Sequence, residues 1–460
     1  MAQRGTLADT TAKWKDYALY VLRHQSQLHT AILGAVLAAV AYKLLALPGA
    51  ARLPGAGLAL FAAVVGAYEA WEHLQRYRFA GHAHIKPLAQ VEIGADTKIA
   101  PDALQPSPGQ RAMGFTGRYT GANRVFCSDR LDADLLERDW SILVDQDRLG
   151  RVRRLVREHR EHGLAYLTAL LRDAGRNGAL LVNEDKLCLA DELSAQVVHC
   201  HRAGYFDSLC TNNASMVSLV EGHRISHPYT PDSTLYPVAH GVEGYYLQDL
   251  HEADLCNGIG VSTLAITADR CFVLGQQTRK NVQSPGMLIC TASGSCDYAD
   301  LNAASLRRTL VGAMERELAE ECHARGGRGL PPSAGGLAAE TRIIGFFRWL
   351  QRGGKPEFIG ISRLRVDARV LAPDGFEVAG IVGQTHAGEP VRRRNQFPVP
   401  TLADLPRAIA DIRHLFEGDE TVQPLRPALP LRRILDVLEH LHATRPQVLH
   451  EILYGEPSAP

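Results

Sequence analysis

The sequence predicts an α+β protein that carries an apolar two-helix hairpin near its N-terminus. Residues 28–47 and 53–71 are two apolar runs separated only by the turn PGAAR, and each is close to the ~20 residues that a membrane-spanning helix needs. From residue 129 onward, leucines at helical spacing alternate with short apolar runs that are typical of strands. A length of 460 residues, 46% of them hydrophobic, is sufficient for two or three domains with their own cores.

These patterns divide the chain into six segments. The stretch IAPDALQPSPGQ, residues 99–110, is rich in Pro and Gly and therefore predicts a linker. The predicted segments are a cytoplasmic N-terminal segment (1–27), a transmembrane hairpin (28–73), a linker and irregular region (74–128), an α+β region of unknown role (129–250), a domain of strands around a glutamate-rich helix (251–420), and a C-terminal helix and tail (421–460).

The segments on either side of the hairpin hold more basic residues than its turn does. Only Arg52 lies in the turn, whereas the flanks hold Lys13, Lys15, Arg23, Arg76, Arg78 and Lys86. The positive-inside rule then places both termini in the cytoplasm, which predicts a two-pass protein of the inner (plasma) membrane. Tyr42, Tyr68 and Trp71 fit an aromatic belt at the membrane surface. The alternative is a buried helical hairpin of a soluble domain.

Composition restricts the classes of partner. Small residues along both apolar runs allow close helix packing, and so a homo-oligomer. The formal net charge is zero, so no direct DNA or RNA partner is expected. The nine cysteines form no CxxC pair, which is typical of reduced thiols in a cytosolic protein.

The region 129–250 offers one weak candidate for a metal site. Charged residues alternate with leucines from 129 to 173, and strands are predicted at ALLVN and AQVVHCH. His199 and His201 would share one face of a strand, near Cys210 in the sequence. The competing interpretation is a strand and loop with ordinary histidines. Tyr205 and Phe206 could stack on a base or fill a core.

From residue 257 onward, strands lead into a capped helix. VSTLAIT and RCFVLGQQ predict two strands joined at Ala268-Asp269, and SPGMLICTASGS predicts a turn, a strand and a Gly/Ser loop. Ser305 is a plausible helix cap, and Gly326 with Gly327 should end the helix. The buried face should be Leu306, Leu310, Met314 and Leu318.

This helix crowds glutamates at 315, 317, 320 and 321. Like charges at i,i+4 cost a helix roughly 0.2–0.5 kcal/mol per pair. Either the glutamates form a solvated face, with Arg316 paired to Glu320, or a cation offsets the repulsion. Carboxylates are ligands that Mg²⁺ prefers, together with substrate phosphates.

The helix core RELAEE, residues 316–321, resembles the Nudix box, whose pattern is G-x5-E-x7-R-E-U-x-E-E-x-G-U. SPGMLICTASGS resembles the strand and loop before that box, and residues 341–364 resemble the strands after it. The resemblance covers roughly 257–420 and implies an α/β/α sandwich with a mixed sheet. The pattern's glycine and lone glutamate fall at Asn302 and Arg308, so Gly294 would be the loop glycine and CDYADLNA an insertion.

The resemblance implies a role for each matching residue. Glu317, Glu320 and Glu321 would hold Mg²⁺ or Mn²⁺, with Glu317 also catalytic and Arg316 orienting a carboxylate. Gly294, Ser295 and Asp297 would lie in the substrate loop. The implied activity is hydrolysis of a diphosphate in a nucleotide-type ligand.

A two-helix hairpin ahead of such a domain also resembles predicted effectors of bacterial anti-phage systems that signal with cyclic oligonucleotides. In that alternative the domain senses a nucleotide and the hairpin disrupts the membrane. The tail, 401–455, predicts two amphipathic helices that pack on the domain or form a dimer surface. Residues 392–394 form an arginine run that meets phosphates or is simply solvated.

Overall fold

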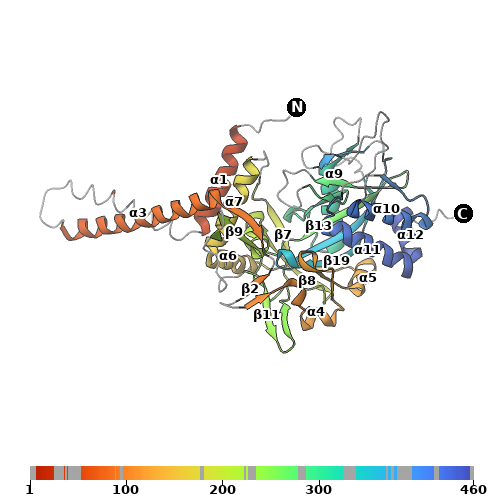
Figure 1. Cartoon of the computed structure of the whole chain (residues 1–460), viewed down its shortest axis with the longest axis horizontal. Helices are drawn as coiled ribbons and strands as arrows, with labels where there is room; N and C mark the ends of the chain where they lie inside the picture. The colour runs from red at the N-terminus through yellow and green to blue at the C-terminus, as the bar shows by residue number, and fades with distance from the viewer. Residues whose placement is uncertain are drawn as a thin grey trace. The chain divides into compact units, whose positions relative to one another are not determined.

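Helices and a mixed sheet make up the protein, which confirms the predicted α+β class. The structure is a computed structural model (Figure 1). It describes residues 7–24, 36, 39, 53–88, 90–93, 97–176, 181–221, 224–225, 235–277, 286–324, 338–368, 371–373, 378–380, 396–418 and 424–455. The chain forms two units. Unit 1 comprises 1–98, 150–183 and 204–236, and unit 2 comprises 99–149, 184–203 and 237–460.

Unit 1 is mainly helical. Its helices are α1 (Leu7–His24), α3 (Leu53–His82), most of α6 (Arg148–Glu158), α7 (Arg160–Arg176), α8 (Tyr205–Ser208), the π-helix η4 (Leu209–Asn213) and η5 (Ala214–Met216). A small antiparallel sheet joins β1 (His84–Pro87), β9 (Val217–Glu221) and β10 (Arg224–Ile225), and β2 (Val91–Ile93) pairs with β3 (Thr97–Ile99). Tyr20 donates a 2.9 Å hydrogen bond to Asp207, which fixes α1 against α8.

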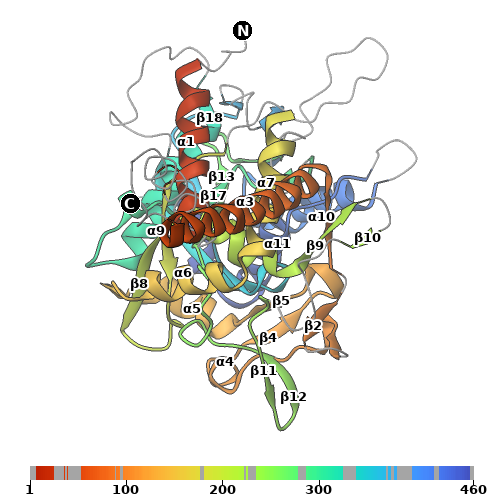
Figure 2. The same cartoon turned by 90° about the vertical axis from the view of Figure 1, so that its left-hand side faces the viewer.

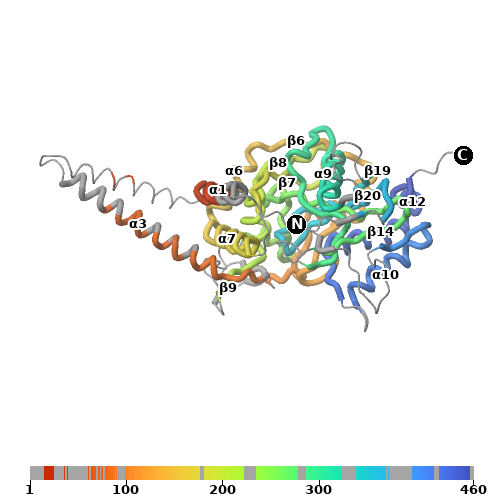
Figure 3. The backbone as a smooth tube through the Cα atoms, turned by 90° about the horizontal axis from the view of Figure 1, so that it is seen from above, coloured from red at the N-terminus to blue at the C-terminus, as the bar shows by residue number. Residues whose placement is uncertain are grey.

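The predicted hairpin is only partly within the described residues. Its first run, 28–47, lies outside them apart from residues 36 and 39. Its second run lies in α3, which continues through residue 73 to His82 and extends beyond α1 and α7 (Figures 1 and 3). On α3, Phe61, Tyr68 and Trp71 are 70%, 66% and 57% exposed. Within the described part of the chain, none of the helices combines the length and apolarity needed to cross a bilayer.

An eight-stranded mixed sheet organises unit 2. Its order is β23-β14-β13-β20-β19-β5-β4, and β17 also pairs with β13. β13 runs parallel to β20 and antiparallel to β14 and β17. The strands are β4 (Thr116–Arg118), β5 (Val125–Cys127), β13 (Gly260–Ile266), β14 (Cys271–Val273), β17 (Ala292–Ser295), β19 (Ala338–Trp349), β20 (Lys355–Leu364) and β23 (Gln396–Pro398).

Helices cover both faces of this sheet. Alternate residues of β20 point to opposite faces. Ile359 and Ile361 pack in one core with α10 (Leu405–Glu417), α11 (Leu429–Thr444) and α12 (Pro446–Tyr454). Gly360 lies under Met314 of α9 (Leu306–Glu321), where a Cβ would stand 2.6 Å from the sulfur. The tail helices therefore pack on the sheet face opposite α9, as one of the two predicted alternatives held.

Smaller sheets and helical turns complete unit 2. The strands are β6 (Ser141–Val144), β7 (Asp185–Leu189) and β8 (Val197–Gly204) in one sheet; β11 (Val238–Gly241) with β12 (Gly244–Leu247); β15 (Gly275–Gln277), β16 (Leu288–Ile289) and β22 (Val378–Gly380); and β18 (Cys322–Ala324) with β21 (Leu371–Pro373). β11 and β12 form a projecting hairpin (Figures 1 and 2). The remaining helices are α4 (Pro108–Ala112), α5 (Asp129–Glu137), η2 (Pro101–Ala103), η3 (Gly121–Asn123), η7 (Tyr298–Asp300), η8 (Leu350–Arg352) and η9 (Leu402–Asp404).

The predicted linker is folded. Residues 101–103 form η2 and residues 108–112 form α4, which has a capping box between Ser107 and Gln110. Leu104, Ser107 and Gln110 are each fully buried. Pro101 and Pro108 lie in the first turns of η2 and α4, so Pro in this stretch indicates neither a linker nor exposure. β4 and β5, also in the predicted linker region, belong to the large sheet.

Several predicted boundaries differ in the structure. The helix α9 ends at Glu321 rather than at Gly326-Gly327, because Cys322–Ala324 pairs with β21 as strand β18. The predicted Gly/Ser loop is strand β17, paired with β13. At ALLVN, the described residues 181–183 are not in a strand, and β7 begins at Asp185. The second tail helix divides at Arg445, before Pro446.

Candidate functional site

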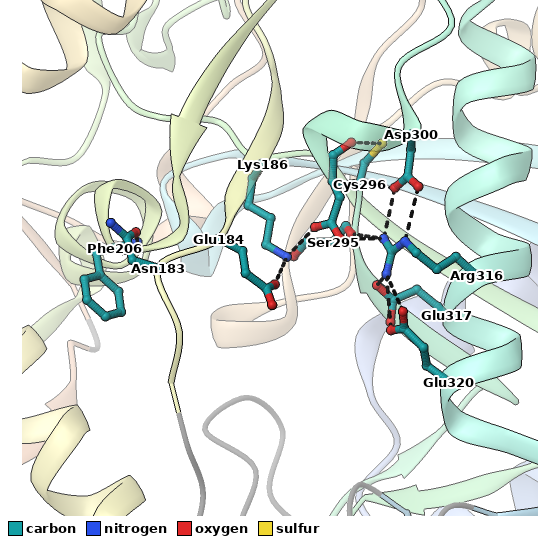
Figure 4. Close-up of polar contacts among 11 residues, drawn as sticks. Asn183, Glu184, Lys186, Phe206, Ser295, Cys296, Asp300, Arg316, Glu317 and Glu320 are labelled. Atoms are coloured by element: carbon teal, nitrogen blue, oxygen red, sulfur yellow. Dashed lines mark hydrogen bonds and ion pairs between the residues drawn. The ribbon is translucent and has the colours of Figure 1, made fainter. Parts of the chain in front are cut away.

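Arg316 lies at the centre of a cluster of carboxylates in unit 2. It is carried by α9, whose N-terminus is capped by Ser305 as predicted, with the Ser305 side chain accepting from the backbone N–H of Arg308 at 2.9 Å. The predicted face of α9, made of Leu306, Leu310, Met314 and Leu318, is buried. The side of α9 that carries Arg316 therefore points away from this face. Arg316 Nη1 donates to Glu317 at 2.9 Å and to Glu320 at 3.2 Å (Figure 4).

The other edge of the Arg316 guanidinium meets residues 295–300, which precede α9 in the chain. Asp300 accepts two hydrogen bonds, from Nε at 3.2 Å and from Nη2 at 3.0 Å. Nη2 also donates to the carbonyl of Ser295 at 2.9 Å and lies 3.5 Å from the Asp297 carboxylate. A fork of this kind holds the plane of a guanidinium more firmly than a single contact.

The Glu317 carboxylate lies directly on strand β17. A Cβ at Gly294 would stand only 2.1 Å from Glu317 Cδ, so any other residue at this position would displace the Glu317 carboxylate from β17. Glu317 is 8% exposed. Burial raises the pKa of Glu317 to about 7, against the lowering effect of Arg316, and the nearby charge of Glu320 raises it further. The carboxyl group therefore changes protonation near neutral pH.

Lys186 of β7 extends the cluster. Its ammonium group contacts Asp297 at 2.5 Å and Glu184 at 2.9 Å (Figure 4). Burial alone would lower the pKa of Lys186, but the hydrogen bonds to Asp297 and Glu184 raise it, so the side chain stays charged. A backbone bridge between Lys186 and Asp297 fixes the two elements at this point.

Carboxylates are ligands of the kind that a hard cation takes, but the structure does not bring together the three carboxylates that the resemblance implied. Glu317 and Glu320 meet at Arg316 Nη1, whereas Glu321 is 2% exposed and lies in the core. Burial, with the charge of Glu321, raises the pKa of the thiols of Cys290 and Cys322. Among the described residues, no three His, Cys, Asp or Glu side chains are arranged to hold a metal ion.

The site has an excess of negative charge that would favour a cation. Arg316 and Lys186 face five carboxylates, which are Glu184, Asp297, Asp300, Glu317 and Glu320. Glu320 is the more open of the two on α9, with 57% of its side chain exposed. Glu317 and Glu320, which Arg316 Nη1 holds next to each other, are therefore the two carboxylates of α9 that could hold a divalent ion.

The histidines of β8 have structural partners. His201 is fully buried, its Nε2 lies 3.0 Å from the carbonyl of Cys256, and burial lowers its pKa to about 4. His199 pairs with Asp191. In unit 1, the thiol of Cys210 donates to the carbonyl of Gly163, and Phe206 is buried against Tyr20. These contacts favour the interpretation of ordinary core and strand residues.

Three members of the cluster were not predicted from the sequence. Glu317, Glu320, Arg316, Gly294, Ser295 and Asp297 all gather at one place, but Asp300, Lys186 and Glu184 were not expected there. Asp300 had a local signal, because Asp297 and Asp300 form a capping box around η7. Lys186 had none, since its contact depends on the pairing of distant segments. The arginine run at 392–394 lies outside the described residues.

A comparison of the chain with models of known protein families finds no match, and a comparison with curated proteins finds none either.

Proposed function

We propose that the protein is a membrane-anchored Nudix-like hydrolase that binds a nucleoside-diphosphate-type ligand together with Mg²⁺ or Mn²⁺ and cleaves its diphosphate. The observation that carries the proposal is the seat of Glu317 on Gly294, beside Arg316 and Glu320. A buried carboxyl group with a pKa of about 7 suits proton transfer at neutral pH. A mixed sheet with helices on both faces supports the Nudix-like sandwich.

Each residue then has a chemical role. Glu317 and Glu320 would hold the cation, and Glu317 would accept a proton from the attacking water. The cation supplies polarisation of the diphosphate when bound. Arg316 keeps both carboxylates in place while the site is without a cation. Lys186, which stays charged beside Asp297, would contact an incoming phosphate.

Metal binding should depend on pH through Glu317. Below a pH of about 7 the carboxyl group is protonated and competes poorly for a cation, so affinity should rise as the pH increases through 7. We expect about a tenfold gain per pH unit between 5.5 and 7, levelling above it. Calorimetric titration of the full chain with Mn²⁺ at several pH values measures this.

Variants separate the roles of Glu317 and Glu320. Glu317→Gln should abolish the pH dependence, and Glu320→Gln should weaken binding while keeping it. Glu315→Gln is the matched control, because Glu315 is an exposed residue of the same helix. Equal affinity in wild type and in a Glu317→Gln, Glu320→Gln double variant would refute the assignment of the metal site.

The exposed apolar side chains of α3 support the membrane part of the proposal. Phe61, Tyr68 and Trp71 leave more than half of their surface uncovered. We infer that residues 28–73 form the two-helix hairpin in the inner membrane, with both termini and the bulk of the chain in the cytoplasm. Assembly of hairpins into a homo-oligomer is compatible with their small residues.

Reporter fusions test this topology. Reporters at residue 1 and after residue 82 should both report the cytoplasm, and one at Arg52 the opposite side. A chain lacking residues 1–82 should leave the membrane fraction. If the truncated chain partitions to membranes as fully as the intact chain, the hairpin is not the anchor.

A second candidate is a nucleotide-sensing membrane effector of anti-phage defence. In it, the site binds a cyclic or linear nucleotide and the hairpin oligomerises to disrupt the membrane. The chain connectivity favours it: unit 1 ends one segment at Asn183, and the chain then enters β7, which carries Lys186 of the site. Strand β7 therefore connects the site directly, along the chain, to the unit that contains the predicted hairpin.

A further inference from the structure

Asp300 belongs to the segment CDYADLNA, which interrupts the Nudix-like pattern before α9. The position where that pattern places its lone glutamate is Arg308 in this chain, so α9 supplies no carboxylate there. Asp300 nevertheless brings a carboxylate to Arg316 from the interruption itself. Its side chain is only 10% exposed, so it is built into the fold rather than solvated.

The Arg316 guanidinium makes its contacts through two edges. Nε and Nη2 form the fork with Asp300 at 3.2 Å and 3.0 Å. Nη1, on the other edge, is then aimed at Glu317 and Glu320. Because a guanidinium is planar and rigid, fixing one edge fixes the direction of the other.

Asp300 is itself held by backbone contacts. Its Oδ2 accepts a 2.8 Å hydrogen bond from the backbone N–H of Asp297, and its own N–H donates to the Asp297 carbonyl at 3.0 Å. Asp297 in turn contacts Lys186. The acceptor is therefore in place independently of α9, which is what a group that orients another side chain requires.

We propose that Asp300 is the positioning residue of the site: it holds the Arg316 guanidinium so that Nη1 keeps Glu317, which lies on Gly294, together with Glu320. Asp300 acts through Arg316 rather than on the glutamates themselves. The role of these glutamates in metal binding rests on the proposed function, but the coupling between Asp300 and Glu317 does not.

A double-variant cycle tests the coupling. Asp300→Asn, Glu317→Gln and the combined variant of the full chain are unfolded in denaturant, together with wild type. Because both carboxylates act on one guanidinium, the midpoint shift of the combined variant should be smaller than the sum of the single shifts. Asp297→Asn is the matched control, with a single 3.5 Å contact to Arg316, and its shift should add to that of Glu317→Gln more closely. Additive shifts for Asp300 would overturn the proposal.

Titration of the same variants with Mn²⁺ gives a second readout. Asp300→Asn should weaken Mn²⁺ binding about tenfold in the wild-type background and hardly at all in the Glu317→Gln background. Asp300→Glu, which restores the charge, should recover part of the affinity. An equal loss in both backgrounds would contradict a positioning role.

The two readouts distinguish the proposals. If Asp300 and Glu317 are coupled in unfolding but wild type binds no Mn²⁺, the proposed function fails and the positioning role of Asp300 stands. If wild type binds Mn²⁺ through Glu317 but the unfolding shifts are additive, the positioning role fails and the proposed function stands.

Discussion

Asp132→Ala should lower the free energy of unfolding of unit 2 by about 3–5 kcal/mol, because it leaves the buried charge of Arg433 without its main partner. Asp132 on α5 accepts from Arg433 Nη2 and, at 2.9 Å, from the backbone N–H of Phe346 on β19. Arg433 on α11 is 1% exposed. One carboxylate therefore joins two helices to the central sheet.

The pH of this measurement matters. Burial raises the pKa of Asp132 to about 6, against the lowering effect of Arg433. Because an unfolded aspartate has a pKa near 3.9, the folded state binds the proton more tightly, and stability falls as pH rises from about 4 to 6. Denaturant unfolding at pH 7.5 lies above this window, where the pair is fully charged.

Two further variants serve as controls for the loss in Asp132→Ala. Asp129→Ala removes a neighbouring carboxylate of α5 that is 3.5 Å from Arg433 and 40% exposed, so it should cost far less. The double variant Asp132→Leu, Arg433→Met removes both charges and should recover most of the stability. If Asp132→Ala and Asp129→Ala lower the free energy of unfolding equally, the burial of the Asp132–Arg433 pair does not determine how much the pair contributes to stability.

Features that depend on contacts between residues close in the sequence could be predicted, whereas features that depend on distant segments could not. The face Leu306, Leu310, Met314 and Leu318 and the Ser305 cap depend on helical spacing alone, and both are present. The end of α9 depends on a strand partner some fifty residues away, so glycines at 326–327 were a misleading signal. Local patterns thus predict an element better than they predict its boundary.

The candidate site shows the same division. Arg316, Glu317 and Glu320 are close in sequence, and Gly294 followed from the resemblance. The resemblance also grouped Glu321 with them, but the structure places Glu321 in the core near Cys290 and Cys322. Lys186 reaches Asp297 across 111 residues of sequence, a contact that no local pattern encodes.

Glu317→Gln should lower diphosphate hydrolysis by about 10²–10⁴-fold if the protein is an enzyme, because the variant loses the group that accepts the proton. The amide has nearly the same shape, so it can still occupy the Gly294 seat and accept from Arg316 Nη1. The measurement uses the full chain, Mg²⁺, and a panel of nucleoside-diphosphate-linked and cyclic nucleotides. Glu315→Gln, exposed on the same helix, should keep wild-type activity.

The same variant separates the tethered enzyme from the sensor when the chain is reconstituted into dye-loaded vesicles. A nucleotide can shift the hairpin between two states only by its difference in affinity for them, and about 5.5 kcal/mol moves a population from 1:99 to 99:1. A sensor should therefore release dye with one nucleotide of the panel, and Glu317→Gln should still do so, since binding rather than turnover drives the change. The enzyme should hydrolyse its ligand in intact vesicles, release no dye with any nucleotide, and lose hydrolysis in Glu317→Gln. Hydrolysis that survives Glu317→Gln would show that Glu317 is not the group that accepts the proton.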